Sequence, residues 1–230
     1  MAARPVFVPS DAVSQLVDAL SIEFHWHPGL APIQKQRNVV ALHEAAKARG
    51  VWPILEVSTK SADRLGYRLS AFNLKVSLDD GRLITVESAF QGSKQFSRGG
   101  PFTDLFGKSG AEIKSDQRIR NSGPLQCFSY QGISWPLEPK TAFYDWLYIR
   151  AVDEQIGANS GILNYAGFTD IEFNPKRSIN CQARSCALYV SLMRRQLFSA
   201  VTIDRKVFMK VLSDDSASDR QSGEHQETLF

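Results

Sequence analysis

Residues 70–94, SAFNLKVSLDDGRLITVESAFQGSK, decide how the middle of this chain folds. Apolar residues alternate over 74–78, the turn signal DDG follows at 79–81, and a second extended run leads to Thr85. Alternation on both sides of such a turn is typical of a β-hairpin. Thr85 is suited to cap a helix, and Glu87 falls in the first turn, where the helix dipole favours a negative charge. The stretch therefore predicts a hairpin followed by a short helix.

Glu87, Gln91 and Lys94 in the same stretch follow helical spacing, at i, i+4 and i+7. One helical stripe would therefore present a carboxylate, an amide and an amine together. Ala89 and Phe90 beside this stripe indicate the buried edge of the helix. Polar groups next to an apolar seam could serve N-glycosidic chemistry, and charged residues at this spacing are also typical of a solvated surface. The pattern alone leaves both interpretations open.

The composition is that of a soluble globular protein with one substantial domain. The 230 residues are 43% hydrophobic and 22% charged, and a chain of this length buries a core without disulfides or a structural metal. Residues 211–230 hold five acidic residues and one basic residue, which leaves 26 basic and 19 acidic side chains, a net charge of +7, in residues 1–210. A basic body suits a protein that meets phosphates, and it also fits a surface with surplus lysine and arginine.

Several classes of protein are disfavoured by the sequence. The N-terminus lacks the apolar run of a signal peptide, and no later run has the length of a membrane span. Cys127, Cys181 and Cys186 form no C-x-x-C pair, so we expect a reducing cytoplasm, with Cys181 and Cys186 as small buried residues. His25 and His27 share a strand face, but no third ligand has suitable spacing. We therefore expect a cytoplasmic protein with no membrane, metal or cofactor.

The chain divides into an extension, a core and a tail. Residues 1–60 predict a strand–helix–strand extension packed on the core, with strands over 22–27 and 53–58 and a helix over 32–49. Residues 61–212 form the expected core.

Within the core, three stretches have helical patterns. Residues 109–120 are polar and helix-compatible, 140–159 are strongly amphipathic, and a last firm helix is expected over 181–195. Residues 213–230 are rich in Ser, Asp, Glu and Gln, and this composition predicts a disordered acidic tail.

The order of motifs in residues 70–94, SAFN and then VESAFQGSK after a turn, resembles the signature of the NADAR family. In that family a Ser-Asn-Phe-type element precedes a helix that begins V-E-H and continues Y-Q-x-x-K. One branch, whose members are paired with guanine-specific DarT-type DNA ADP-ribosyltransferase toxins, is similar in seven blocks over about residues 20–195. These blocks are PILEVSTKS, LSAFNLKV, VESAFQGSK, GGPFTDL, RNSGPL, WPLEPKTAFYDWLY and FTDIEFNPKRSINCQAR. The D-x-x-W-G element common in the wider family is absent, and NPKR at 174–177 stands near its place.

The resemblance implies an α+β fold, a single NADAR-type domain with the N-terminal strand–helix–strand extension. It also implies an N-glycosidase that removes ADP-ribose from guanine bases in DNA and so acts as antitoxin to a DarT-type toxin. Its partners would be ADP-ribosylated DNA and, in function, that toxin. Two alternatives stay open: an N-glycosidase acting on a small phosphorylated riboside, as in riboflavin biosynthesis, and a non-catalytic module that binds ADP-ribose or the toxin.

Glu87 and Lys94 correspond to the helix glutamate and lysine of the family, so the resemblance implies that they are catalytic. Glu87 could act as general acid and base, because a partly apolar pocket moves the pKa of a carboxyl towards neutrality. Lys94 could orient a phosphate as a cation. If desolvated, Lys94 could instead attack the anomeric carbon and form a Schiff base with the opened ribose, and the resemblance favours this second role.

The expected substrate-binding residues combine the resemblance with local patterns. Asp170 and Glu172 alternate among aromatic residues, so they face either a cleft or the outer side of an edge strand. Asn180 and Gln182 precede the last helix, whose free N–H groups suit a pyrophosphate, and plain capping by Ser178 or Asn180 is compatible with this role. The full set is Ser70, Phe72, Asn73, Gln91, Gly100, Asp170, Glu172, Asn180 and Gln182.

Other groups fit the proposed substrate less specifically. The pair Gly99-Gly100 would let the backbone approach a phosphate or merely turn the chain. An aromatic set is expected to be core rather than a base-stacking platform: Trp135, Phe143, Tyr144 and Trp146. DNA with an unpaired or flipped modified base would also need contacts to phosphates, for which the candidates are Lys108, Lys114, Arg118 and Arg120.

Overall fold

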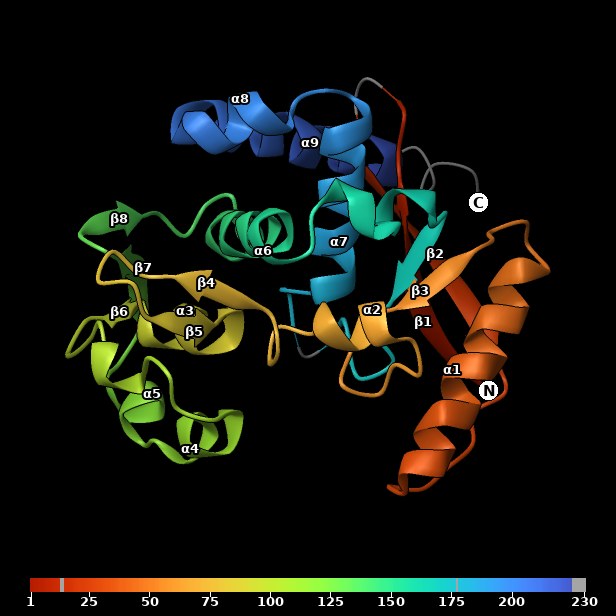
Figure 1. Ribbon diagram of the computed structural model, residues 1–230, viewed down its shortest axis with the longest axis horizontal. Coiled ribbons are helices and arrows are strands. Elements are labelled where there is room, and N and C mark those ends of the chain that lie inside the picture. The colour runs from red at the N-terminus through yellow and green to blue at the C-terminus, as the bar shows by residue number, and fades with distance from the viewer. Residues whose placement is uncertain (13–14, 177, 225–230) are drawn as a thin grey trace.

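The computed structural model describes residues 1–12, 15–176 and 178–224, with side chains up to residue 215. The fold is α+β, with three small sheets and helices on both sides of the largest sheet (Figure 1). The strands are β1 (Ala2–Pro9), β2 (Val17–Phe24), β3 (Ile54–Glu56), β4 (Lys75–Ser77), β5 (Leu83–Thr85), β6 (Lys94–Phe96), β7 (Leu125–Tyr130), β8 (Ile133–Trp135) and β9 (Gly167–Thr169). The α-helices are α1 (Pro32–Lys47), α2 (Arg64–Arg68), α3 (Val86–Gly92), α4 (Gly110–Ser115), α5 (Arg118–Asn121), α6 (Ala142–Gln155), α7 (Gln182–Arg194), α8 (Phe198–Ile203) and α9 (Arg205–Glu224).

The largest sheet joins the N-terminal segment to the middle of the chain. Its strand order is β2-β1-β9-β3, with β1 antiparallel to β2 and β9, and β3 parallel to β9. Successive side chains of a strand point to opposite faces. Accordingly Val6 packs in the apolar cluster of α1 with Val39 and Leu42, whereas its neighbour Phe7 packs in the main core with α7. The sheet therefore lies between α1 and α7 (Figure 1).

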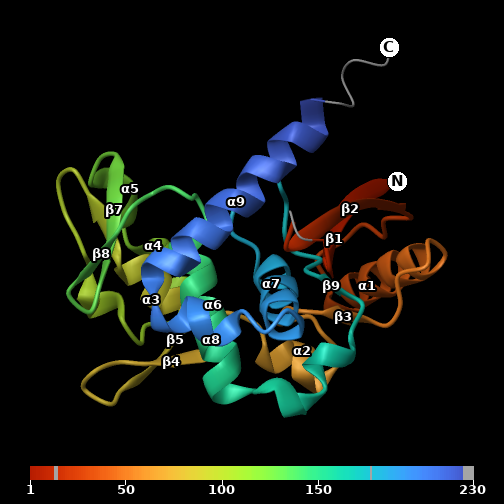
Figure 2. The same ribbon diagram turned by 90° about the horizontal axis from the view of Figure 1, so that it is seen from above.

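The main core surrounds α7, which is buried along most of its length and packs against α6. Arg184 of α7 holds two carboxylates, with Nη atoms 3.1 Å from Asp145 on α6 and 3.1 Å from Asp215 on α9. Asp215 also accepts a hydrogen bond from the backbone N–H of Leu16. These contacts bring α6, α7 and α9 together, and α9 extends past the body at its C-terminal end (Figure 2).

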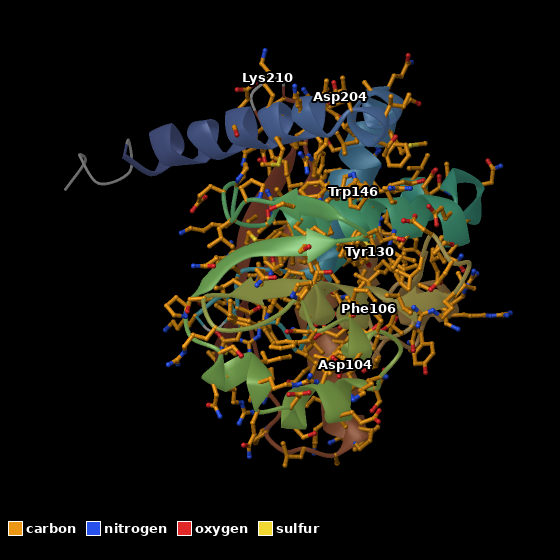
Figure 3. The ribbon with its side chains drawn as sticks, turned by 90° about the vertical axis from the view of Figure 1, so that its left-hand side faces the viewer. Asp104, Phe106, Tyr130, Trp146, Asp204 and Lys210 are labelled. Atoms are coloured by element: carbon orange, nitrogen blue, oxygen red, sulfur yellow. The ribbon has the colours of Figure 1, made fainter. Side chains whose placement is uncertain are left out.

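The other side of the molecule carries the β4–β5 hairpin, α3, and the three-stranded sheet β6-β7-β8. Three aromatic rings follow one another there: Phe106 and Tyr130 have centroids 6.2 Å apart, and Tyr130 and Trp146 have centroids 6.4 Å apart. Figure 3 shows these three residues one above another on this face. They cover the edge of the core next to α6.

The hairpin and the helix predicted from residues 70–94 are confirmed. Lys75 pairs with Thr85 across the β4–β5 hairpin, and the Thr85 hydroxyl accepts a hydrogen bond from the N–H of Ser88 at 3.2 Å. The predicted helical position of Lys94 is wrong, because α3 ends at Gly92 and Lys94 begins β6 opposite Phe128. The backbone leaves the helical conformation before Lys94, because Lys94 pairs with β7.

The N-terminal 60 residues contain one strand more than predicted. The additional strand, β1, includes Pro5 and Pro9, and proline is uncommon within strands. The predicted strand over 22–27 is the end of β2, and the predicted helix over 32–49 is α1. Because β9 lies between β1 and β3, this segment shares a sheet with the core.

Two other predictions need correction. Residues 109–120 form two short helices, α4 and α5, because the chain is extended at Asp116, whose carboxylate binds Arg118 instead. The tail predicted to be disordered from residue 213 is helical to Glu224, and Asp215 within it is buried against Arg184. Composition alone could not reveal this buried ion pair. Residues 225–230 lie outside the described residues.

Candidate functional site

A cavity of about 830 Å³ lies between the N-terminal sheet with α1 on one side and α3 with α4 on the other. Seven of the eleven predicted site residues line it: Ser70, Phe72, Glu87, Asp170, Glu172, Asn180 and Gln182. These residues come from the loop after α2, from α3, from the loop after β9 and from the start of α7. The remaining four, Asn73, Gln91, Lys94 and Gly100, are not part of the lining.

Glu87 is held at the cavity by the first turn of α3. Its backbone N–H donates to the carbonyl of Ala71 at 3.0 Å, and its Oε1 accepts from Nε2 of Gln91 at 3.0 Å. Tyr144 lines the cavity nearby and is buried. Burial raises the pKa of Tyr144 well above its ordinary value, and the charge of Glu87 adds to this shift. We call the side of the cavity formed by α3 and the residues packed on it, Glu87, Gln91 and Lys94, the α3 wall. At this wall the carboxylate of Glu87 lies beside the neutral phenol of Tyr144.

Lys94 lies behind Gln91 and is separated by it from Glu87. Its Nζ donates to Oε1 of Gln91 at 2.7 Å and lies 5.1 Å from the ring centroid of Phe90. Burial lowers the pKa of Lys94, and the charge of Glu87 opposes this shift. The three polar residues thus form one chain, carboxylate–amide–amine, although Lys94 is no longer on the helix. A lysine in an apolar setting with a lowered pKa is closer to a neutral amine than a solvated one.

Asn73 and Gly100 support the wall from outside the cavity. Asn73 Nδ2 donates to the carbonyl of Tyr67 at 2.8 Å and so closes the turn after α2. Gly100 has φ +90°, and a Cβ at this position would lie 2.2 Å from the carbonyl oxygen of Lys94. Only glycine fits so close to that backbone. Both residues hold the α3 wall in shape.

The floor of the cavity is built from Asp170 and Gln182. Gln182 Nε2 donates to Oδ2 of Asp170 at 2.9 Å, while its Oε1 accepts from the N–H of Ala71 at 2.7 Å. The carbonyl of Ala71 in turn accepts from the N–H of Glu87. Burial raises the pKa of Asp170 to about 6. The amide of Gln182 therefore fixes the distance between the two acidic sides of the site.

Asp170 and Glu172 do not alternate on a strand, so the edge-strand alternative is wrong. β9 ends at Thr169, and the N–H of Glu172 donates to Oδ1 of Asp170 at 3.0 Å in the turn that follows. Glu172 lies at the rim, 2.9 Å from Nζ of Lys35. The turn places one carboxylate inward and the other at the cavity mouth.

Glu56 is a buried acid that the sequence analysis missed. Its Oε1 accepts from Ser58 Oγ at 2.6 Å and from the N–H of Ile171 at 2.9 Å, and its Oε2 contacts Thr169 Oγ1 at 2.7 Å. Burial, and then the charge of Asp170, raises the pKa of Glu56 to about 8. A glutamate within the apolar strand 53–58 was the signal available in the sequence. Here it fixes the turn that carries Asp170.

His43 of α1 extends this cluster. Its Nε2 lies 2.8 Å from Thr169 Oγ1, and burial lowers the pKa of His43 to about 4. At neutral pH the imidazole is therefore uncharged, and Thr169 stands between it and Glu56. We name the set Glu56, Ser58, Thr169 and His43 the buried acid cluster.

The segment before α7 differs from the predicted cap. The residue that caps α7 is Cys181, without a side-chain hydrogen bond, so capping by Ser178 or Asn180 is wrong. Ser178 Oγ instead donates to the carbonyl of Asn180 at 3.2 Å. Within the described residues, Asn180 Oδ1 is buried without a hydrogen-bond partner, and Asn180 lines the cavity. Arg177, in the NPKR stretch, lies outside the described residues.

Of the four basic residues proposed for phosphate contacts, only Lys114 lines the cavity. Arg118 is held 2.6 Å from both Asp104 and Asp116, and Arg120 donates to the carbonyl of Lys114 at 3.3 Å. Lys108 lies 3.9 Å from Asp104. The other cations of the lining were not anticipated: Arg4, Lys35 and Lys60.

The aromatic set is mostly core. Trp135 and Phe143 are buried, with ring centroids 5.6 Å apart, and Trp146 packs against Tyr130 on the face shown in Figure 3. Tyr144 alone among the four lines the cavity.

The other cysteines and histidines that the structure describes do not form a metal-binding group. Cys181 and Cys186 are buried, and burial raises the pKa of both thiols. The rings of His25 and His27 lie 4.8 Å apart. In residues 1–12, 15–176 and 178–224, no group of three or more His, Cys, Asp or Glu is placed to hold a metal ion. No helix in the same ranges combines the length and apolar character needed to cross a membrane.

A family model described as DarT1-associated NADAR antitoxin matches residues 2–222. This range includes the N-terminal sheet as well as α3 and α7. A comparison with curated proteins finds no match.

Proposed function

Because this chain belongs to the DarT1-associated NADAR antitoxin family, we propose that it is an N-glycosidase that removes ADP-ribose from guanine bases in DNA. The observation that carries this proposal is the cavity in which Glu87 and Asp170 face a rim of cations. By reversing the modification that the associated toxin makes, the enzyme acts as antitoxin. The toxin is then a functional partner and modified DNA the substrate.

The size and charge of the cavity support a nucleotide-sized substrate. At about 830 Å³ it lies in the upper part of the range typical of ligand sites, and it exceeds what a small riboside needs. Arg4, Lys60 and Lys114 line it without an ion pair among the residues described. Such cations suit a diphosphate, and the carboxylates Glu87 and Asp170 suit a sugar with a developing positive charge.

Glu87 is proposed as the general acid and base. In the first step the bond between the anomeric carbon and the exocyclic nitrogen of guanine breaks, and Glu87 donates a proton to that nitrogen as it leaves. A water molecule then gives its oxygen to the anomeric carbon, and its proton returns to Glu87. The products are unmodified guanine and ADP-ribose, and Glu87 regains its starting protonation state.

Lys94 fits two chemistries. As a cation behind Gln91 it assists proton transfer at Glu87 by charge alone. As a neutral amine it forms a bond to the anomeric carbon, and guanine leaves with a proton from Glu87. The bond from the anomeric carbon to the ring oxygen then breaks, one proton passes from the lysine nitrogen to that oxygen, and the opened ribose is a Schiff base. Water hydrolyses the Schiff base to ADP-ribose and the free lysine, and the surplus proton returns to Glu87. The lowered pKa of Lys94 supports the second role, which also requires its Nζ to leave Gln91 and enter the cavity.

DNA would reach the cavity with its modified base unpaired or flipped from the stack, because a paired base cannot enter such a pocket. Contacts from Lys114 and the other rim cations to phosphates make binding weaken as salt rises.

The direct test is to incubate the protein with a single-stranded oligonucleotide carrying ADP-ribose on one guanine and to measure free ADP-ribose and restored oligonucleotide. We expect release by the native protein and none by Glu87→Ala/Lys94→Ala. The matched control, Glu44→Ala/Lys47→Ala, removes the same residue types from the exposed face of α1 and retains activity.

Two outcomes would overturn the proposal. Binding of ADP-ribose without any release would identify a non-catalytic module. Release from a phosphorylated riboside, but not from the oligonucleotide, would identify a small-molecule glycosidase. Full activity in the double variant would overturn the assignment of the catalytic residues alone.

A further inference from the structure

The wall of the cavity opposite α3 combines an indole ring with two cations. Arg4 comes from β1, Trp26 follows β2, and Lys35 lies in the first turn of α1. The guanidinium carbon of Arg4 lies 5.3 Å from the Trp26 ring centroid, and Nζ of Lys35 lies 5.8 Å from it. Phe24 packs against Trp26 edge to face, with centroids 6.1 Å apart, and fixes the ring. The three lining residues form what we call the Trp26 wall.

The two cations of the Trp26 wall differ in their partners, and Arg4 retains unused binding capacity. Within the described residues Arg4 forms no ion pair, and its buried Nε has no hydrogen-bond partner. Its one hydrogen bond among these residues, from Nη1 to the carbonyl of Ala3 at 2.9 Å, leaves the charge without compensation. Lys35 is paired with Glu172, a half-exposed carboxylate at the rim. A buried donor without a partner is costly unless a ligand or water supplies the acceptor.

We propose that the Trp26 wall is a nucleotide subsite, in which a nucleobase stacks on the indole and the adjoining phosphate meets Arg4 and Lys35. An aromatic ring beside cations matches the two parts of a nucleotide, because bases stack on tryptophan and phosphates bind guanidinium and ammonium groups. The subsite rests on the proposed function, since it extends the same cavity away from Glu87. Two sources can supply this nucleotide: the adenosine half of ADP-ribose, or the neighbouring nucleotide of the DNA strand.

The chain contains a control for this role. Trp52 also has a lysine over its ring, Lys47 at 4.9 Å, but it is 53% exposed and does not line the cavity. Trp52→Ala therefore removes the same kind of cation–ring contact without touching the subsite. Trp26→Phe keeps a stacking ring, and thermal unfolding of each variant checks that it is folded.

The first experiment measures the KM of Trp26→Ala for two substrates, an ADP-ribosylated oligonucleotide and ADP-ribosylated deoxyguanosine. We expect KM to rise about 5- to 150-fold, the range that corresponds to loss of one base stacked on an aromatic ring, with little change in kcat. Trp26→Phe recovers most of the affinity, and Trp52→Ala leaves it unchanged. A rise for both substrates assigns the subsite to adenosine, and a rise for the oligonucleotide alone assigns it to the neighbouring nucleotide.

The second experiment tests the cations with Arg4→Met. If the first experiment assigns the subsite to adenosine, inhibition by ADP is compared with inhibition by adenosine. If it assigns the subsite to DNA, inhibition by a deoxynucleotide is compared with inhibition by its deoxynucleoside. The variant loses affinity for the phosphorylated ligand and keeps its affinity for the nucleoside, whereas Trp26→Ala loses both.

The inference and the proposed function fail in different ways. An unchanged KM of Trp26→Ala for both substrates, in a protein that releases ADP-ribose, overturns the subsite and leaves the function intact. If the native protein releases nothing, the function is overturned. Calorimetry then measures the affinity of three variants, Trp26→Ala, Trp26→Phe and Trp52→Ala, for ADP and for an unmodified oligonucleotide. The subsite is overturned if all three variants bind both ligands as tightly as the native protein does.

Discussion

The α3 wall and the buried acid cluster each contain one glutamate, and the surroundings of Glu87 and Glu56 differ. Glu87 is half-buried, lines the cavity and has the amide of Gln91 as its side-chain partner. Glu56 is 3% exposed and contacts Ser58 and Thr169. No ion pair joins Glu56 to a cation within the described residues. A carboxyl that faces a cavity can exchange a proton with substrate, whereas one enclosed beside another acid retains it.

The same substitution at the two glutamates should therefore give opposite results. Glu87→Gln keeps the hydrogen bond to Gln91 but removes the transferable proton, so we expect ADP-ribose release to fall about 10²- to 10⁴-fold. Glu56→Gln keeps the hydrogen bonds of a protonated carboxyl and should keep activity at pH 7. The measurement is the single-turnover release rate, with Glu44→Gln as control. Retained activity in Glu87→Gln would remove Glu87 from the mechanism.

The next prediction concerns Lys94, the amine of the α3 wall. Lys94→Arg keeps the positive charge but cannot form a Schiff base, so we expect a loss of about 10²-fold or more if the amine attacks the ribose. Borohydride added during turnover should then link ADP-ribose covalently to the native protein and not to Lys94→Arg. The link should map to Lys94 by peptide mass analysis.

Two results would contradict the attacking role of Lys94. One is near-native release by Lys94→Arg, and the other is a failure to trap ADP-ribose on the native protein. Either result would leave Lys94 with the role of a charge behind Gln91. Lys47→Arg, on the exposed face of α1, controls for nonspecific trapping at lysines.

The local pattern of residues 70–94 predicted much of the α3 wall. Alternation over 74–78 and the cap at Thr85 are short-range signals, and the structure contains both the hairpin and α3. The position of Lys94 was wrong because it depends on pairing with Phe128, which lies 34 residues further along the chain. Helical spacing predicts where a side chain points only while the helix continues.

The buried acid cluster could not be predicted in this way. Glu56, Thr169 and His43 come from three separate parts of the chain, and only the packing of β3, β9 and α1 brings them together. The same holds for Gln182, whose position before the last helix suggested a contact to phosphate. In the fold, its amide instead joins Asp170 to Ala71. Tertiary contacts decide which polar residues of a sequence become buried.

Gln182 connects the two acidic regions, and its replacement should weaken both. Gln182→Leu leaves the N–H of Ala71 and a carboxylate oxygen of Asp170 without their partner. We expect about 2–4 kcal/mol less stability, the cost of two buried groups left unsatisfied, and about a tenfold fall in kcat because α3 shifts relative to Asp170. Urea unfolding and the release rate measure the two effects. Gln155→Leu, at the end of α6, is the control.

A fall in stability without any fall in kcat would show that Gln182 holds the fold but does not position Glu87. A positioning role also predicts a changed pH dependence of kcat, because a change in the distance between Asp170 and Glu87 changes the electrostatic interaction between the two carboxyl groups. A residue that only filled space would leave that profile unchanged.

The smallest expected effect is the pH dependence that Glu56 imposes on stability. Its pKa is raised to about 8 in the folded protein, from 4.5 in the unfolded chain, so the folded state binds the proton more tightly. The stability from this group is complete below pH 4.5 and is lost as pH rises towards 8. Between pH 6.5 and 8 the loss amounts to about 2 kcal/mol, at 1.36 kcal/mol per pH unit.

The window from pH 6.5 to 8 isolates Glu56 from its neighbours. The pKa of Asp170 is raised to about 6, so its own loss of stability is largely complete below the window. The pKa of His43 is lowered to about 4, so its contribution rises with pH and is largely complete at its ordinary value of 6.5. Cys181, which is also close, has a raised thiol pKa and stays protonated throughout.

Glu56→Gln should therefore lose less stability than the native protein between pH 6.5 and 8, by about 2 kcal/mol, in urea unfolding at matched ionic strength. Glu44→Gln is the comparison, since it removes a carboxyl of the same type from the exposed face of α1. Parallel curves for Glu56→Gln and the native protein would mean that Glu56 ionises within the folded site. Glu56 and the neighbouring Asp170 would then be two adjacent charges, and enclosure in the buried acid cluster would not keep Glu56 protonated.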